Sequence, residues 1–544
     1  MTDAETWRKS ALKSGTLTAG VLAAVLLAAG AVPAAAKEKA AAAAPAADLI
    51  LLNGEIYTPT GFAEAVAVRD GVIVAVGKGD EISAQKGKRT KVVDLRGATV
   101  LPGLHDLHVH PTMAGMKALY ACEFEGTATP DEVLATVKAC VAKRKPGEWI
   151  TGGNWGEAMF VDRPPTKEML DAVAPDNPVV LNDESHHTYW VNSLALERAG
   201  ITRDTPVPAG GIIDKDANGE PIGLVRETAR AYIRNAIPRR VEELEKAVAW
   251  SIAAMNAQGI TSFVEATLDE PAMAAYARLA DKGKLTARVQ GCIRWNYDAE
   301  RPDAINADII NRNLYARERF SPSCVKIYMD GVPLGGNTAA MLEDYHTEPH
   351  DQGVLIVPPA DLAPMVTRFD RMGLRMKFHA AGNLAARAAL DALTVARRAN
   401  GATGLLHDVG HLTFTDEADH GRYEAIGVVA EFSPYIWYPT PIMDIDVRRA
   451  LGDAMMDKVY PVRAVLDTGA LVVAGSDWPV VPSVSPWLAI ETLVTRKDPD
   501  NPGDKAIAPR QAISVAEALS LFTVNGARLM GQSHEVGTIA PGML

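Results

Sequence analysis

Two histidines separated by one residue form the first pattern that could bind a metal ion. His108 and His110 lie in the sequence LPGLHDLHVHP, residues 101–111. Side chains two residues apart on a β-strand point to the same side, so both imidazoles can face one metal ion. An isolated pair is weak evidence in a chain with 12 histidines. This pair closes an apolar strand, the position at which parallel barrels place their chemistry, and that context strengthens the interpretation.

Three more residues of ligand type follow apolar strand signals later in the chain. His379 ends the segment RMKFH, His411 ends HDVGH, and Asp477 follows LVVAGS. A single histidine at a strand end is most often a packed or solvated side chain without a function. Four histidines and an aspartate at strand ends are harder to explain in that way. Imidazole and carboxylate ligands suit zinc, with manganese, iron and cobalt as alternatives.

Lys326 lies in the segment CVKIYMDG, residues 324–331, and is harder to interpret. A free ammonium group has no lone pair with which to bind a metal ion. Its simplest structural role is an ion pair with a carboxylate such as Asp330. The residues alone do not decide between that role and a function in a metal centre.

The strands that would position these side chains alternate with helical patterns over roughly 400 residues. Apolar strand signals cover 104–109, 179–182, 260–265, 287–293, 325–329, 375–379, 407–411, 428–433 and 471–475. Helical patterns between them include 241–258, 384–400 and 516–522. Repeated strand–helix units predict an α/β fold with a closed parallel (β/α)8 barrel. Because a barrel needs only eight strands, we expect the strand at 179–182 to belong to an insertion.

A run of short β-branched segments precedes the barrel. The signals cover 50–57, 65–68, 72–76 and 91–95. Asn53-Gly54 and Asp70-Gly71 are predicted hairpin turns. We expect a small β domain over residues 48–102 and a barrel over 103–534. A Pro- and Gly-rich stretch at about 127–238 is predicted to be an inserted subdomain that binds substrate.

The composition indicates a large folded protein that does not bind nucleic acid. The 544 residues are 48% hydrophobic and 22% charged, which allows a sizeable core and excludes global disorder. The net charge is −12, whereas nucleic-acid binding rewards clusters of lysine and arginine.

The N-terminus has the pattern of a secretory signal. Basic residues at positions 8, 9 and 13 precede an uncharged stretch, residues 14–36, that ends in the cleavage-type sequence AAA. We therefore expect a signal peptide over 1–36, a low-complexity linker over 37–47, and a periplasmic or secreted mature protein without stable membrane insertion. The alternative is an uncleaved membrane anchor, because the uncharged stretch is nearly long enough to span a bilayer.

The four cysteines do not form a metal-binding pattern. Cys122, Cys140, Cys292 and Cys324 include no CxxC spacing, so a thiolate zinc site is not expected. An exported protein can pair its cysteines. Cys292 and Cys324 lie in apolar strand-like segments, which predicts ordinary buried thiols.

Together these motifs resemble the amidohydrolase superfamily, and within it the YtcJ-like group (amidohydrolase family 3) that includes N-substituted formamide deformylases. The resemblance runs from about Asp48 to the C-terminus. The segments that carry it, in order, are LPGLHDLHVHP (101–111), HHTYWVNSLALERAGI (186–201), GIIDKDANGEPIGLVRE (211–227), VKIYMDGVPLGGNTAAM (325–341), FHAAGN (378–383), GH (410–411) and GSDWPV (475–480).

The resemblance implies a two-metal centre. Its expected ion is zinc, and the residues that match the family's ligands are His108, His110, Lys326, His379, His411 and Asp477. Lys326 would be carboxylated, so that its carbamate bridges the two ions. The implied activity is hydrolysis of a C–N bond other than a peptide bond, in a small N-acyl or N-formyl substrate, by a metal-activated water.

The resemblance also implies catalytic roles for two residues. Asp477 would act as general base and then general acid. His187 matches a position near the substrate and would bind it or its carbonyl oxygen, with a solvent-exposed histidine as the alternative. Glu227 lies in a family motif, with a purely structural role as the alternative. Four aromatic residues are candidates for an apolar pocket, with core packing as the alternative: Trp155, Trp437, Tyr438 and Trp478.

Two other functions fit the same residues. One is hydrolysis of an ester, lactone or cyclic amide at the same site, which the fold does not exclude. The other is a catalytically silent metal-binding protein, against which the intact set of six ligand-type residues argues. The sequence leaves open whether the chain forms a homo-oligomer.

The chain departs from the family pattern at several positions. The family usually has an acidic residue where Asn383 stands, glutamate where Gly410 stands, and glycine where His186 stands. These departures leave the ligand set intact but put the substrate in doubt. Strands from about residue 535 would complete the β-sandwich-like small domain, yet the sequence stops at Leu544. Either the sequence is truncated or its small domain is incomplete.

Overall fold

The computed structural model describes residues 45–544 apart from positions 126, 161–162, 184–187, 209–210, 296, 298–301, 334–336, 348–349, 437–441 and 502. The predicted signal peptide, residues 1–36, lies outside the described residues. Residues 46–544 form one compact unit. Among the described helices, none combines the length and apolarity that a membrane span requires.

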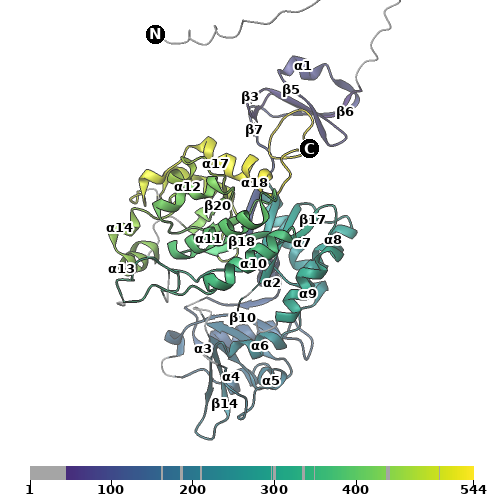
Figure 1. Cartoon of the computed structure of the whole chain (residues 1–544). Coiled ribbons are helices and arrows are strands. Elements are labelled where there is room, and N and C mark those ends of the chain that lie inside the picture. The colour runs from purple at the N-terminus through teal and green to yellow at the C-terminus, as the bar shows by residue number, and fades with distance from the viewer. Residues whose placement is uncertain are drawn as a thin grey trace, which may run out of the picture. The chain divides into compact units, whose positions relative to one another are not determined.

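An eight-stranded parallel sheet forms the centre of the described chain (Figure 1). Each strand pairs in parallel with the next. In sheet order the strands are β8 (Leu104–Val109), β15 (Ile260–Leu268), β16 (Arg288–Trp295), β17 (Phe320–Tyr328), β18 (Arg375–Ala380), β19 (Asp408–His411), β20 (Val429–Phe432) and β21 (Val472–Ala474). The predicted (β/α)8 barrel is confirmed.

Backbone hydrogen bonds between the segments that end β8 and follow β21 close the seam of this barrel. The amide of Asp477 donates to the carbonyl of His108 at 2.6 Å, and the amide of His110 donates to the carbonyl of Trp478 at 2.8 Å. The first and last strands therefore meet at the residues that carry the candidate ligands.

Helices between the strands pack around the barrel. They include α7 (Val241–Ala257), α8 (Glu270–Asp281), α10 (Pro359–Arg371), α11 (Asn383–Asn400), α12 (Glu417–Ala425) and α17 (Val515–Phe522). In α11 the buried positions are mostly alanine and leucine, which lets the helix lie close to the sheet, and Arg397 and Arg398 occupy its last turn. Gly401, at φ 75°, ends the helix with a backbone conformation that favours glycine.

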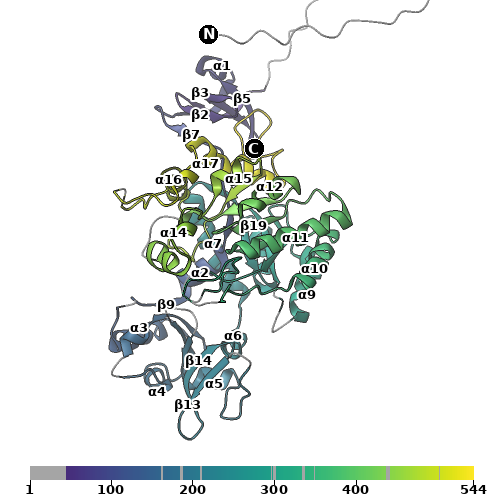
Figure 2. The ribbon, with the colours of Figure 1, turned by 60° about the vertical axis from the view of Figure 1, so that its left-hand side comes forward.

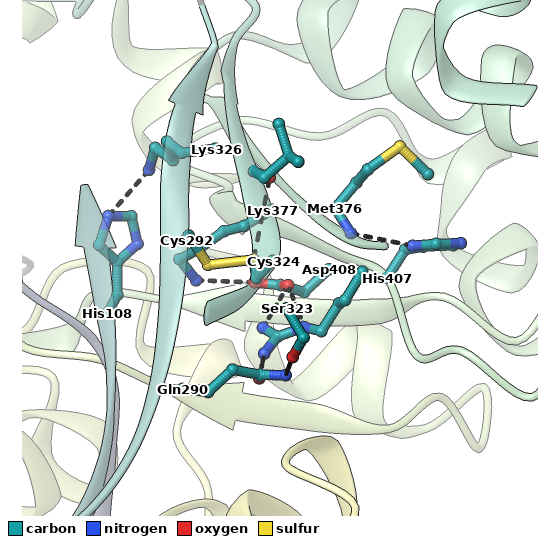
Figure 3. Close-up of a disulfide and its surroundings, with 12 residues drawn as sticks. His108, Gln290, Cys292, Ser323, Cys324, Lys326, Met376, Lys377, His407 and Asp408 are labelled. Atoms are coloured by element: carbon teal, nitrogen blue, oxygen red, sulfur yellow. Dashed lines mark hydrogen bonds and ion pairs between the residues drawn. A yellow bond between two sulfur atoms is a disulfide. The ribbon is translucent and has the colours of Figure 1, made fainter. Parts of the chain in front are cut away.

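A disulfide joins two neighbouring strands inside the barrel. Cys292 on β16 and Cys324 on β17 are register partners, and their sulfur atoms are bonded (Figure 3). Both are fully buried in a cluster with Leu107, Val264 and Val429. The prediction of free thiols at these positions is wrong, because the sheet register brings the two side chains together.

A second sheet lies between β8 and α7 in the sequence. Its six described strands run in the order β13 (Gly211–Lys215), β14 (Pro221–Glu227), β12 (Thr188–Val191), β11 (Val179–Asp183), β10 (Ile150–Trp155) and β9 (Ala121–Glu123). The ninth strand candidate, at 179–182, is thus β11 of this sheet. The helices α3 (Pro130–Val141), α4 (Lys167–Asp171), α5 (Ser193–Arg198) and α6 (Arg230–Ala236) lie beside it (Figure 2). A disulfide joins Cys122 on β9 to Cys140 on α3.

An additional β domain is formed by the N-terminal strands. One sheet contains β1 (Ala47–Leu52), β4 (Ala65–Arg69), β5 (Val72–Gly77) and β6 (Lys86–Asp94). The other contains β2 (Glu55–Thr58), β3 (Gly61–Ala63) and β7 (Thr99–Val100). The turn at Asp70-Gly71 forms the predicted hairpin of β4 and β5. Asn53-Gly54 does not form a hairpin, because it leads the chain from β1 in one sheet to β2 in the other.

The C-terminal segment contacts this β domain. The amide of Ile73 donates to the carbonyl of Met543 at 2.7 Å, and the amide of Gly542 donates to the carbonyl of Ile73 at 2.8 Å. Ile539 packs in the same apolar cluster as Ile56 and Val66.

Candidate metal centre

The carboxyl ends of the barrel strands bring the six predicted ligand residues to one region. His108 and His110 end β8 and begin the next turn, His379 lies in β18, His411 ends β19, and Asp477 follows β21. Lys326 lies near the end of β17. The parallel direction of all eight strands explains this convergence, because every carboxyl end then points the same way.

Three of these residues form a compact buried group. The ligand atoms of His108, His411 and Asp477 lie within 4.8 Å of one another, and all three residues are buried. The rings of His108 and His411 are 4.5 Å apart between centroids, and those of His379 and His411 are 4.3 Å apart. Imidazoles and a carboxylate at this spacing can bind one metal ion or two neighbouring ions.

Asp477 lies close to His108, near the end of β8, and to His110, which follows it. Its Oδ1 atom is 3.1 Å from Nε2 of His110 and 3.6 Å from Nε2 of His108. The side chain is about one-tenth exposed, so its carboxylate can contact both histidines and a molecule that enters the barrel.

Lys326 points toward His108 rather than toward Asp330. Its Nζ atom lies 2.9 Å from Nε2 of His108 (Figure 3). Asp330 accepts hydrogen bonds from the amides of Ala340, Ala381 and Gly382 at 2.8 to 3.0 Å. The ion pair between Lys326 and Asp330 considered from the sequence is therefore wrong. Burial lowers the pKa of Lys326 to about 7, so a neutral amine is accessible near physiological pH.

Three histidines of the centre, His108, His379 and His411, are held in the neutral form. Burial lowers the pKa of His379 to about 4, and it lowers the pKa values of His108 and His411 well below the usual range. Nearby cationic groups add to the effect, above all Lys326 beside His108. A neutral imidazole retains the lone pair that a metal ion requires.

Two of the candidate ligands have unusual backbone conformations. His411 has φ 73° and Asp477 has φ 59°. Both values lie in the left-handed region, which residues other than glycine rarely adopt. Such conformations cost free energy and cluster at functional sites, where the surrounding structure enforces them.

A network of charged side chains lies beneath the centre. The sequence motifs did not predict it. Lys377 on β18 places Nζ 2.7 Å from Asp408, 3.1 Å from Glu431 and 3.0 Å from the carbonyl of Leu107. Arg375 pairs with Asp408. All four charged side chains are almost fully buried and pair with one another, as buried charges must. The available signal was a charged residue within each apolar strand segment: RMKFH, HDVGH and VVAEF.

Of the other predicted positions, some lie outside the described residues and others lie in aromatic contacts. His186, His187, Trp437 and Tyr438 lie outside the described residues. Trp155 packs against Phe160 and Trp190 in the core of the second sheet, which supports its core-packing alternative. Trp478 is 8% exposed and stacks on Trp250, with ring centroids 6.1 Å apart.

The donor set fits a divalent metal ion. Neutral imidazoles and an aspartate converge in a buried space, and nitrogen and oxygen ligands of this kind suit zinc and its neighbours. Lys326 fits such a centre only after conversion to an anion, because an ammonium group offers no lone pair.

Comparisons with known proteins find relatives that match most of the chain. A sequence model of the amidohydrolase family matches residues 91–544. Protein LONG AFTER FAR-RED 3 of Arabidopsis thaliana is 29% identical over 525 residues, which cover 92% of this chain and 87% of the plant protein. YtcJ of Bacillus subtilis strain 168 is 29% identical over 495 residues, 88% of this chain and 89% of its own. N-substituted formamide deformylase of Arthrobacter pascens is 27% identical over 506 residues, covering 91% and 92%.

A solved structure has the same fold. The crystal structure of an uncharacterized metal-dependent hydrolase from Pyrococcus furiosus superposes with a TM-score of 0.73 at 22% sequence identity. The superposition covers 91% of this chain and 97% of the archaeal one. The barrel and its accompanying domains are therefore a recurring architecture.

Proposed function

The chain belongs to the amidohydrolase family, and from this membership we propose that it is a metal-dependent hydrolase that cleaves a C–N bond of a small molecule, other than a peptide bond. The observation that carries the proposal is the convergence of His108, His411 and Asp477, whose ligand atoms lie within 4.8 Å of one another. A buried group of neutral imidazoles and a carboxylate has little structural purpose without an ion to bind.

The proposed centre holds two divalent ions, with zinc as the first candidate. The residues that would hold them are His108, His110, Lys326, His379, His411 and Asp477. Lys326 joins the set as a carbamate, and its pKa of about 7 supports this, since only a neutral amine adds carbon dioxide. When bound, the metal supplies a hydrolytic water of lowered pKa and polarises the scissile carbonyl.

Asp477 is the proposed proton carrier. Its Oδ1 atom faces His110 and His108, so the carboxylate lies where an attacking water would be held. Asp477 accepts a proton as the water oxygen bonds to the carbonyl carbon. It returns that proton to the leaving nitrogen as the C–N bond breaks, which yields a carboxylic acid and an amine. Burial of the surrounding histidines excludes bulk water and strengthens the electrostatic interactions of the carboxylate.

The proposed substrates are N-formyl and N-acyl amines. Support comes from the N-substituted formamide deformylase that is 27% identical to this chain over most of its length. His187 is the proposed partner of the substrate or of its carbonyl oxygen, and it lies outside the described residues.

Turnover by the purified, metal-loaded protein tests the proposal. The panel contains N-formyl amines, N-acyl amines, cyclic amides, esters and lactones, and Asp477→Asn is the matched control for contaminating hydrolases. We expect amide-type compounds to be hydrolysed and the control to be inactive. Turnover of esters or lactones alone would instead assign the first alternative. Bound metal with no turnover of any compound would assign a catalytically silent protein.

We also propose that the chain is exported and cleaved before Lys37. The basic and then uncharged start of the sequence supports this, and so do the two disulfides among the described residues, since disulfides persist in oxidising compartments. N-terminal sequencing of protein recovered from the periplasm or medium tests the proposal. Intact Met1 in a membrane fraction would favour the anchored alternative.

A further inference from the structure

Glu431 is a fully buried carboxylate in direct contact with a candidate ligand. It lies on β20, with 0% of its surface exposed, and its Oε2 atom is 2.7 Å from Nδ1 of His108. The same oxygen is 3.1 Å from Nζ of Lys377. Glu431 therefore connects the charged network inside the barrel to the candidate metal centre.

This contact determines which nitrogen of His108 faces the centre. The Nδ1–H group donates to Glu431, which leaves the lone pair on Nε2. Nε2 is the atom that lies 2.9 Å from Lys326 and 3.6 Å from Asp477. The carboxylate thus fixes both the ring orientation and the tautomer that a metal ligand needs.

Glu431 also reaches a second imidazole through Ser433. Nδ1 of His411 is 3.3 Å from the hydroxyl of Ser433, and that hydroxyl donates to Oε1 of Glu431 at 3.4 Å. These contacts are longer than that of His108, so they hold His411 less firmly. The two oxygens of one carboxylate nevertheless orient ligands from two different strands.

Gly410 provides the space that Glu431 occupies. A Cβ atom built at position 410 would overlap Oε2 of Glu431. Gly410 lies within β19, where other residue types adopt the same extended backbone, so the position needs glycine for space rather than for conformation. Any side chain there would push the carboxylate away from His108.

We propose that Glu431 is the positioning residue of the metal centre. The absence of a side chain at Gly410 leaves the space that the Glu431 carboxylate occupies. This inference rests on the proposed function, because it takes His108 and His411 as metal ligands. Removing a partner that orients a metal-bound histidine typically lowers metal affinity by about 10- to 100-fold.

The test measures the dissociation constants of Zn²⁺ and Co²⁺ for the metal-free protein by competition with a chelator. We expect Glu431→Ala and Gly410→Ala each to weaken binding by about 10- to 100-fold. Glu431→Gln should retain most of the affinity, since its amide oxygen can still accept the Nδ1–H of His108. The variant that combines Glu431→Ala with Gly410→Ala should bind the ions about as weakly as Glu431→Ala alone. Both changes break the same contact, between Glu431 and His108.

Two control variants separate positioning from general damage. Asp408→Asn removes a carboxylate from the same charged network without contacting His108. Gly291→Ala overfills another barrel strand, where the new methyl group would meet the flexible end of Leu268. Both should lower the melting temperature. Metal affinity should stay close to that of the wild type.

Four results would overturn the inference. They are wild-type affinity in Glu431→Ala, wild-type affinity in Gly410→Ala, losses that multiply in the double variant, and an equal loss in Asp408→Asn. In each case the wild type still binds metal, so the proposed function survives. A wild type that binds neither ion would overturn the proposed function together with the inference.

Discussion

Nε2 of His110 lies 3.1 Å from Oδ1 of Asp477, although the two residues are 367 positions apart in the sequence. The contact joins the segment after the first strand of the barrel to the segment after its last strand. It places the proposed proton carrier beside two candidate ligands, which makes Asp477 the first residue to test.

Asp477→Asn should lower kcat by about 10²- to 10⁴-fold, the usual contribution of general acid–base catalysis. The amide keeps the shape of the side chain but cannot accept the proton of the attacking water. Turnover is measured at saturating zinc, with circular dichroism to confirm the fold. Recovery of near wild-type rates under added zinc would show that Asp477 only binds metal.

Bicarbonate should accelerate metal uptake by the metal-free protein, and more strongly at pH 8 than at pH 6. The pKa of Lys326 is lowered to about 7 by burial, so the neutral amine that reacts with carbon dioxide becomes the major form as the pH rises through 7. Uptake is followed by the visible absorbance of bound Co²⁺. Lys326→Met should bind less metal and should not respond to bicarbonate. An unchanged response in that variant would exclude the carbamate.

The metal-free protein should lose stability as the pH falls from about 6.5 to about 4. Burial lowers the pKa of His105 to about 4, so over this range the unfolded chain binds a proton that the folded chain does not. Because the unfolded state takes up more protons, acid favours unfolding. The free energy of unfolding is measured in urea at several pH values.

His105→Asn should reduce this proton uptake by about one per molecule, whatever its effect on stability at neutral pH. The matched control is His534→Asn, at a side chain that is 71% exposed. An identical pH slope in His105→Asn and the wild type would contradict the prediction.

Replacing both Cys122 and Cys140 by serine should destabilise the protein by about 3 kcal/mol. The disulfide closes a loop with a sequence separation of 18 residues, and its loss enlarges the unfolded ensemble. Urea unfolding with and without reductant measures the effect. A variant as stable as the oxidised wild type would show that this disulfide adds no stability.

Much of the fold was predictable because strands and helices here have strong local patterns. The apolar segment 104–109 was predicted as a strand, and its bounds match those of β8. The ligand-type residues were also predictable, because parallel strands bring their carboxyl ends together whatever the helices do. His379, His411 and Asp477 could therefore be grouped without knowing any distance.

The remaining features depend on the sheet register, which the sequence does not reveal. Cys292 and Cys324 pair because β16 and β17 align them. Glu431 and His108 likewise meet only across the barrel interior, so nothing local to VVAEF identifies the partner of this glutamate. The role of Gly410 was hidden for the same reason, since its requirement comes from a side chain on the next strand.

Because the seam joins β8 to the segment after β21, we expect the candidate site to form late in folding. The hydrogen bond between the amide of Asp477 and the carbonyl of His108 joins the two ends of the barrel sequence. Contacts between distant parts of a chain tend to form slowly, because loop-closure entropy must be overcome before they are made. An ion that binds only the closed barrel stabilises it in proportion to the logarithm of its concentration. Metal-dependent activity therefore reports that the barrel has closed, and helix content measured alone does not.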